Sequence, residues 1–114
     1  MLNATSQTLR EFVDAKAADG AYRLSDVTLD IPNARTAVFR ARLEGPAGSR
    51  AWARAWLWSE AEKTVAETAS EGVNCGEYVT LTVRLQRDAS PDHASMRIES
   101  SPLRTEHVVQ IKLP

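Results

Sequence analysis

The chain has 114 residues, of which 43% are hydrophobic and 25% are charged, and its formal net charge is −1 at pH 7. These values are typical of one globular domain. They exclude a disordered chain, a collagen-like repeat and the strongly basic surface of a general nucleic-acid-binding protein. The single cysteine, Cys75, excludes an internal disulfide, so packing alone has to hold the fold.

The first twelve residues, Met1 to Phe12, lack the basic start and apolar run of a secretory signal. The sequence also has no stretch of about 20 apolar residues, the length needed to cross a bilayer. We therefore expect a cytoplasmic protein that does not engage membranes, with Cys75 reduced. The chain contains 11 Arg and 17 Ala, a composition typical of bacteria with GC-rich genomes.

The first predicted element is a helix from Thr8 to Asp19. Thr8 and Glu11 have the spacing of a capping box, in which each side chain binds a free amide of the first turn. Gly20 suits the left-handed residue that ends many helices. Three apolar residues fall on one helical stripe: Leu9, Phe12 and Val13. We expect residues 1–20 to be an N-terminal helical segment and residues 21–114 to be one β domain.

After Gly20 the apolar residues recur at every second position, which is typical of half-buried β-strands. Seven stretches follow this pattern: Val27 to Ile31, Ala37 to Leu43, Ala51 to Leu57, Glu62 to Thr68, Tyr78 to Gln86, Ser95 to Glu99, and Glu106 to Leu113. Turn-forming residues separate them. The sequence thus predicts an all-β fold, a two-sheet antiparallel β-sandwich with one short N-terminal helix.

One short run resembles a motif of immunoglobulin-like domains. Asn74-Cys75-Gly76-Glu77-Tyr78 is similar to the Asp-x-Gly-x-Tyr run at the start of strand F, where the Tyr hydroxyl closes a corner onto nearby backbone. Asn74 replaces the Asp, and Thr80 stands where antibody domains have a disulfide Cys. The resemblance implies an immunoglobulin-like sandwich and no particular function.

All three tryptophans lie in the segment Trp52-Ala53-Arg54-Ala55-Trp56-Leu57-Trp58. In a strand, the tryptophans and Arg54 project to one side, and the alanines project to the other. A hairpin with the preceding strand, in which Leu43 faces Ala51, would add two arginines to the same side. We therefore predict one binding face made of Arg40, Arg42, Trp52, Arg54, Trp56 and Trp58.

Three interpretations of this face remain open. The tryptophans could pack against the N-terminal helix, because large aromatic side chains usually bury most of their area. They could form a protein-binding surface, since Trp and Arg are enriched at interface hot spots. They could also form a stacking platform for a sugar or a nucleotide.

The sequence nominates no catalytic residue, no metal site and no cofactor. It lacks a nucleophile elbow, a phosphate-binding glycine loop and a zinc-binding His-Glu-x-x-His helix. One Cys and two separated His do not make a zinc ligand set. Asp88, Asp92 and His93 share a loop and could hold a hard cation, but ordinary turn chemistry explains them more simply.

The leading hypothesis is a non-enzymatic protein–protein interaction or assembly module. It would use the predicted face to bind a protein partner or to form a homo-oligomer; we do not expect nucleic acid as a partner. The first alternative is a small-ligand binder for a carbohydrate or an anionic metabolite. The second is a small hydrolase or isomerase, which would require His93 or His107 beside a carboxylate.

Overall fold

The computed structural model describes residues 5–8, 13–17, 22–60, 63–85, 91–101 and 104–113. This part of the chain contains nine β-strands. In chain order they are β1 (Thr5–Thr8), β2 (Val13–Ala17), β3 (Arg23–Asn33), β4 (Thr36–Glu44), β5 (Arg50–Ser59), β6 (Thr64–Asn74), β7 (Tyr78–Arg84), β8 (His93–Ser101) and β9 (Arg104–Lys112).

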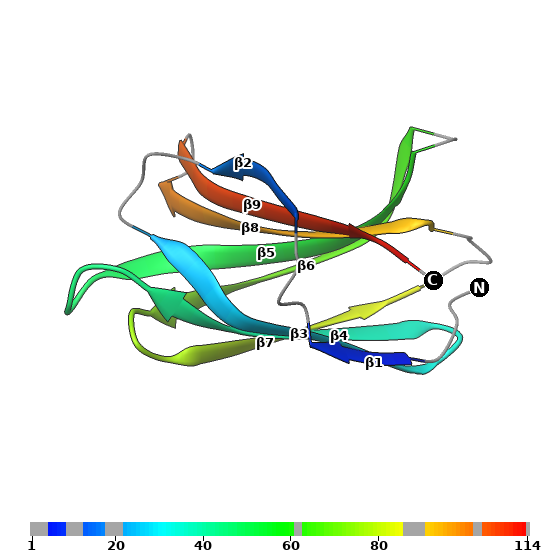
Figure 1. Cartoon of the computed structure of the whole chain (residues 1–114), viewed down its shortest axis with the longest axis horizontal. Helices are drawn as coiled ribbons and strands as arrows, with labels where there is room; N and C mark the ends of the chain where they lie inside the picture. Colours follow the sequence, from blue (N-terminus) through cyan, green and yellow to red (C-terminus); the bar gives the residue numbers. More distant parts are fainter. Residues whose placement is uncertain are drawn as a thin grey trace.

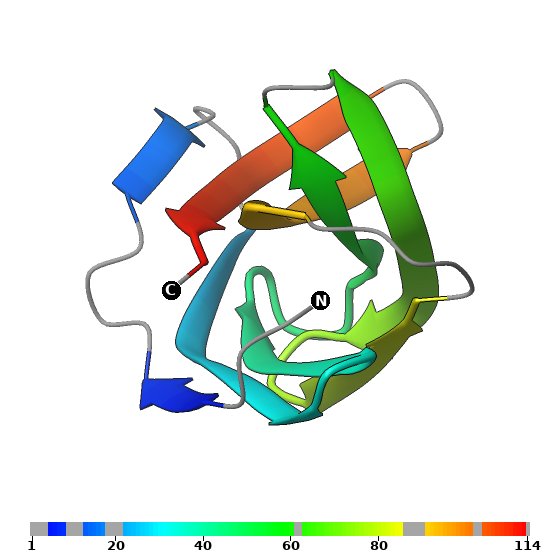
Figure 2. The same cartoon turned by 90° about the vertical axis from the view of Figure 1, so that its right-hand side faces the viewer.

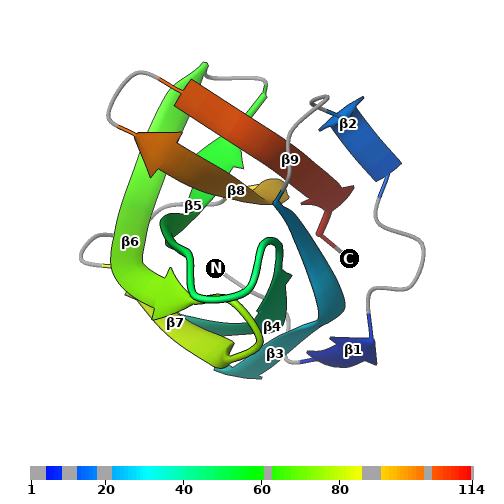
Figure 3. The ribbon, with the colours of Figure 1, turned by 90° about the vertical axis from the view of Figure 1, so that its left-hand side faces the viewer.

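The strands form two antiparallel sheets that pack face to face in a sandwich-like arrangement (Figure 1). Sheet A has the order β1-β3-β4-β7, and sheet B has the order β2-β9-β8-β5-β6. Viewed along the long axis, the two sheets surround a common core (Figure 2). At one lateral side of the sandwich, β6 of sheet B connects through a short turn to β7 of sheet A (Figure 3). Strands β1 and β2 lie at the opposite side.

The core follows from the alternation of buried and exposed residues along each strand. In β7, every second residue is buried and the residues between them are exposed. The largest fully buried side chains come from both sheets and include Phe39, Leu29 and Leu43 of sheet A and Leu57, Met96 and Ile98 of sheet B. Burial of apolar area, at about 25 cal/mol per Å², is the main stabilising contribution for such a core.

Two turns hold one end of the sandwich together. The first joins β4 to β5, and the second joins β6 to β7. The Gly76 amide donates a hydrogen bond to the Leu43 carbonyl (2.8 Å), and the Cys75 amide donates one to the Ser49 carbonyl (3.0 Å). Gly76 has φ +88°, a left-handed conformation in which a side chain would be strained. These bonds connect the turn between β6 and β7 to β4 and to the turn that follows it.

The predicted all-β class, the two antiparallel sheets and the seven strands are confirmed. The seven predicted strands correspond to β3 through β9 in the same order. The largest difference in bounds is at β6, which extends to Asn74, beyond the predicted end at Thr68.

The structure corrects the prediction of an N-terminal helix over Thr8 to Asp19. Thr5–Thr8 and Val13–Ala17 are strands β1 and β2, which pair with β3 and β9. Residues 9–12 and 18–19 of the predicted helix lie outside the described residues. Apolar and polar residues also alternate from Val13 to Ala17, so the segment fits a strand once β9 offers it a free edge.

The predicted hairpin between the two arginine- and tryptophan-containing strands is wrong. Strand β4 lies between β3 and β7 in sheet A, whereas β5 lies between β8 and β6 in sheet B. A strand has only two edges, and both edges of β4 and of β5 are already paired. The turn at residues 45–49 therefore carries the chain from one sheet to the other.

Tyr78 does not form the corner that its sequence run suggested. Tyr78 is the first residue of β7, and its hydroxyl donates a hydrogen bond to Asp26 Oδ2 on β3 (3.1 Å). The acceptor is thus a side-chain oxygen, whereas the predicted corner requires a nearby backbone group. The guanidinium of Arg40 lies 3.9 Å from the centre of the Tyr78 ring. The residue therefore belongs to a polar cluster on the outer surface of sheet A.

We expect Phe39→Ala to lower the free energy of unfolding by about 3–5 kcal/mol, because it removes a fully buried ring from the core. Urea unfolding followed by far-ultraviolet circular dichroism measures this loss. Val38→Ala is the matched control, since Val38 lies on the other side of β4 and is only partly buried; its loss should be about 1 kcal/mol or less. Equal losses for the two variants would contradict the assigned faces of β4.

Candidate functional site

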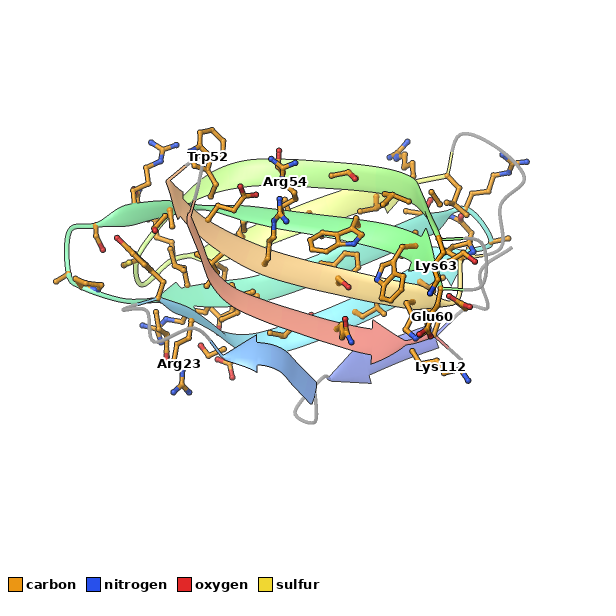
Figure 4. The ribbon with its side chains drawn as sticks, turned by 90° about the horizontal axis from the view of Figure 1, so that it is seen from above. Arg23, Trp52, Arg54, Glu60, Lys63 and Lys112 are labelled. Carbon is orange, nitrogen blue, oxygen red and sulfur yellow. The ribbon has the colours of Figure 1, made fainter. Side chains whose placement is uncertain are left out.

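Strand β5 presents its three tryptophans on the outer face of sheet B. Trp52, Arg54, Trp56 and Trp58 alternate with the buried residues of the strand. Trp52 is 54% exposed, and the other two indoles are half-buried. Figure 4 looks onto this face, with Trp52 and Arg54 towards one end. The predicted common side of these four residues is confirmed.

Strand β8 supplies the other half of this surface. It pairs antiparallel with β5, so its outward residues lie directly opposite those of β5. The opposing pairs are Trp52 with Glu99, Arg54 with Arg97, Trp56 with Ser95, and Trp58 with His93. We call the surface formed by these eight residues the tryptophan face.

Glu99 holds two arginines in the middle of the tryptophan face. Its Oε1 atom lies 2.8 Å from Nε of Arg54 and accepts a hydrogen bond from Nε of Arg97 at 3.1 Å. The Glu99 side chain is only 12% exposed, whereas those of Arg54 and Arg97 are 41% and 34% exposed. The carboxylate is thus covered by two guanidinium groups that stay in reach of solvent.

Arg97 also contacts the neighbouring aromatic ring. Its guanidinium carbon lies 5.3 Å from the centre of the Trp56 ring, within the range of a cation–π interaction. Two positive charges therefore share one negative charge between Trp52 and Trp56. This part of the face keeps a net positive charge of one.

Trp58 is fixed in place from two sides. Its indole Nε1 donates a hydrogen bond to the Ser95 hydroxyl (2.7 Å), and its ring stacks on the His93 imidazole with centroids 4.4 Å apart. Ser95 is only 1% exposed although it lies on the outward side of β8. The indole of Trp58 therefore covers the Ser95 hydroxyl at this end of the face.

His93 lies between two carboxylates at the far end of the tryptophan face. Its Nδ1 donates to Asp92 Oδ1 (2.7 Å), and its Nε2 lies 3.6 Å from Glu60 Oε2. The Glu60 amide also donates to Asp92 Oδ1 (3.0 Å). The hydrogen bond from His93, followed by that from Glu60, lowers the pKa of the Asp92 carboxyl below its ordinary value of 3.8.

This cluster does bring His93 beside a carboxylate, as the hydrolase or isomerase hypothesis requires. Ser95, on the same side of β8, is buried, and its hydroxyl accepts the hydrogen bond from Trp58. It is therefore not open to a substrate. The other candidate, His107, lies on β9 opposite Ile98, away from this end of the sheet. The cluster therefore places His93 beside Asp92 and Glu60, but it identifies no side chain that would act as a nucleophile in a hydrolase.

Arg40 and Arg42 do not belong to the tryptophan face. Both lie on β4, on the outer surface of sheet A. Arg40 covers the ring of Tyr78, and Nε of Arg42 donates to the Gly76 carbonyl (3.3 Å). The predicted six-residue face thus separates into four residues on sheet B and two on sheet A.

The interpretation in which a helix covers the tryptophans is not supported by the described residues. Val13–Ala17 is a strand at the far edge of sheet B, and β9 and β8 lie between it and β5. The indole of Trp52 is 54% exposed. Within the described part of the chain, the end of the face at Trp52 and the guanidinium groups of Arg54 and Arg97 are therefore accessible to solvent.

The described residues offer no candidate for a metal site or for a membrane-spanning helix. They include no group of three or more His, Cys, Asp or Glu that could hold a metal ion. They also include no helix of the length and hydrophobicity needed to cross a membrane. Asp88, one of the possible cation ligands, lies outside these residues. Cys75 is a partly buried free thiol, and its Sγ lies 3.0 Å from Ser49 Oγ.

Sequence reasoning missed Arg97, Glu99 and His93 as members of the face. Arg97 and Glu99 were visible as polar positions of the predicted strand from Ser95 to Glu99, whereas His93 was assigned to the loop before that strand. The missing information was the pairing of β8 with β5, which joins residues about forty positions apart. Arg97 and Glu99, two residues apart and of opposite charge on the same side of the strand, were the local signal for an ion-pair cluster.

We expect Trp52 to provide most of the tryptophan fluorescence that acrylamide quenches, because it is the most exposed of the three indoles. Trp52→Phe should therefore lower the quenching constant and shift the emission maximum to shorter wavelength. Trp58→Phe is the matched control and should leave the quenching constant nearly unchanged, since Trp58 is packed on His93. A larger effect of the control would contradict this geometry.

We expect the Asp92 carboxyl to titrate below 3.8, and His93→Phe to raise its pKa towards that value while keeping an aromatic ring against Trp58. A carboxyl-carbon NMR titration measures both values. Because the folded-state pKa is lowered, the ionised carboxylate stabilises the fold above pH 3.8. This contribution is lost as the pH falls through the folded-state pKa. An unchanged pKa in His93→Phe would contradict the assigned hydrogen bond.

Comparison of the chain with protein-family models, with curated proteins and with solved structures gives no match. No family assignment or relative therefore bears on its function. What remains is the chemistry of the tryptophan face: an exposed indole, two arginines on one carboxylate, and two further indoles fixed by their neighbours.

Proposed function

We propose that the protein is a non-enzymatic interaction module that binds a partner protein through the tryptophan face. The exposed indole of Trp52, directly opposite Glu99 and its two arginines, is the observation that carries this proposal. Trp and Arg dominate binding energy at protein interfaces, because an indole buries a large area and a guanidinium donates several hydrogen bonds.

The fixed side chains of the face favour binding. Glu99 holds Arg54 and Arg97, and Trp58 is held by Ser95 and His93. Side chains that are ordered before association lose less conformational entropy when a partner arrives, at about 0.5–1.5 kcal/mol for each long side chain. The strands beneath them supply a rigid support.

The chemistry of the face indicates the chemistry of the partner. Two guanidinium groups share one carboxylate, so a carboxylate of the partner could complete the charge balance. The indole of Trp52 offers an apolar surface directly beside this charge. We therefore propose a partner surface in which Asp or Glu lies next to an apolar or aromatic side chain.

The order of the strands supports an immunoglobulin-like version of the sandwich. Counted from β3 to β9, sheet A holds the first, second and fifth strands, and sheet B holds the third, fourth, sixth and seventh. Constant-type immunoglobulin domains have the same arrangement, except that their fourth strand pairs with the fifth. We propose that this chain is a variant in which the fourth strand, β6, joins the third.

A small carbohydrate or anionic metabolite is the second candidate ligand. The exposed Trp52 ring could stack on a sugar, while Arg54 and Glu99 offer hydrogen-bond donors and acceptors beside it. Titration of the intrinsic fluorescence with a panel of sugars and organic acids tests this alternative. A saturable change that disappears in Trp52→Phe would favour it over the protein partner.

Selection of binders from a phage-displayed peptide library tests the main proposal. We expect enriched peptides that combine acidic and aromatic residues. Trp52→Ala and Arg97→Ala should each weaken their binding at least about tenfold, because the first removes the exposed indole and the second removes one of the two guanidinium groups beside it. Isothermal calorimetry with one selected peptide gives the affinities, and circular dichroism verifies that each variant is folded.

Arg40→Ala is the matched control for this experiment. It also removes an exposed arginine that lies against an aromatic ring, but on sheet A. Its affinity for the selected peptide should stay within about twofold of the original chain. The proposal fails if no acidic–aromatic peptides are enriched, or if Arg40→Ala and Trp52→Ala weaken binding equally.

A further inference from the structure

Strand β7 has an open edge. It is the last strand of sheet A, and within the described residues only β4 pairs with it. An unpaired edge presents a row of backbone N–H and C=O groups that another strand could bind. From Tyr78 to Val83 this strand has no charged residue, no glycine and no proline, so its sequence does little to prevent such pairing.

The hydrogen bonds to β4 identify the groups that point towards this edge. The Leu43 amide donates to the Glu77 carbonyl (3.0 Å), and the Leu85 amide donates to the Arg35 carbonyl (2.8 Å). Residues of an antiparallel pair alternate between bonding the partner strand and pointing away from it. The odd-numbered residues of β7 therefore bond to β4. The outward groups belong to Tyr78, Thr80, Thr82 and Arg84.

The sequence of β7 is symmetric about Leu81. It reads Val79-Thr80-Leu81-Thr82-Val83 in either direction. Two copies of the strand, arranged antiparallel around a two-fold axis at Leu81, would place Thr80 opposite Thr82 of the second copy. Both residues have outward backbone groups, so they would exchange two hydrogen bonds. A shift of one residue would lose this match and place buried-side residues opposite exposed ones.

The ends of the strand fit the same register. Tyr78 would lie opposite Arg84 of the second copy, an aromatic–cation pair. A hollow of about 290 Å³ lies beside Tyr78, between β6 and β7, and its lining includes Glu71 and Glu77. This hollow leaves room for the end of an added strand. Its lining also includes Arg50, so its two carboxylates leave one net negative charge, which complements Arg84 of the second copy.

We propose that β7 is a self-association site, at which two copies of the chain join their A sheets into one continuous antiparallel sheet. Among the described residues, the edge strands are β1, β2, β6 and β7. Strand β6 suits this role less than β7, because it contains Glu67, Glu71 and Gly72. The proposal is independent of the tryptophan face, which lies on sheet B.

The dimer is transient rather than permanent. Pairing of two seven-residue strands buries less area than the roughly 1,600 Å² of a standard stable interface. Self-association should therefore depend on concentration in the micromolar-to-millimolar range. The tryptophan face stays open in both the monomer and the dimer.

Two double variants test the proposed register. T80E/T82E places like charges opposite each other across the two-fold axis, whereas T80E/T82K places opposite charges there. Both carry T80E opposite Arg40, so on β4 the two variants differ only at residue 82, which lies opposite the uncharged Val38. Sedimentation velocity from about 10 μM to about 1 mM gives the dimer dissociation constants. We expect T80E/T82E to weaken the dimer about tenfold, and T80E/T82K to match or exceed the original affinity.

The original chain should rise from a mass of 12.6 kDa towards twice that value as its concentration increases. Trp52→Ala should follow the same curve. A chain that stays monomeric at about 1 mM would overturn the proposal. Equal weakening by T80E/T82E and T80E/T82K would also overturn it. A dimer that is lost in Trp52→Ala but kept in T80E/T82E would assign self-association to sheet B instead.

Discussion

The strict alternation of β5 is the constraint on which the rest of the structure depends. One side of this strand consists of alanines and Leu57, which fit between two closely packed sheets. Its other side consists of three tryptophans and Arg54. A shift of one residue would place bulky indoles in the core and small methyl groups in water, so only one orientation of β5 is compatible with a packed sandwich. The core and the tryptophan face are therefore two consequences of the same seven-residue segment.

The pairing of β5 with β8 then organises the outer surface. Without Glu99, Arg54 and Arg97 would lie opposite each other as like charges, which destabilises a cross-strand pair. The shared carboxylate removes this repulsion and leaves both guanidinium groups accessible. His93 has a comparable role at the other end, where it connects the Trp58 ring to Asp92. Residues of β8 thus both stabilise the pairing with β5 and position the arginine and tryptophan side chains of the outer surface.

The local part of this structure could be predicted from the sequence, and the nonlocal part could not. Alternation identified seven strands and the correct sides of Trp52 and Ala53, because a period of two is a local property. It could not identify pairing partners, so Arg40 was joined to β5 instead of Arg97. The segment Val13–Ala17 has too few residues to separate helical from strand periodicity, and the edge of β9 decides its structure.

The turns at residues 45–49 and 75–77 are joined by a backbone hydrogen bond, which limits how the length of either turn can change during evolution. Many sandwich domains recognise ligands with end loops that vary in length independently of one another. Here the Cys75 amide donates to the Ser49 carbonyl of the other turn, and the Gly76 amide donates to the Leu43 carbonyl of β4, just before that turn. An insertion in either turn would leave amide or carbonyl groups of both without partners. New specificity at this end would require coordinated changes in two distant parts of the chain, whereas single substitutions on the open sheet surfaces carry no such requirement.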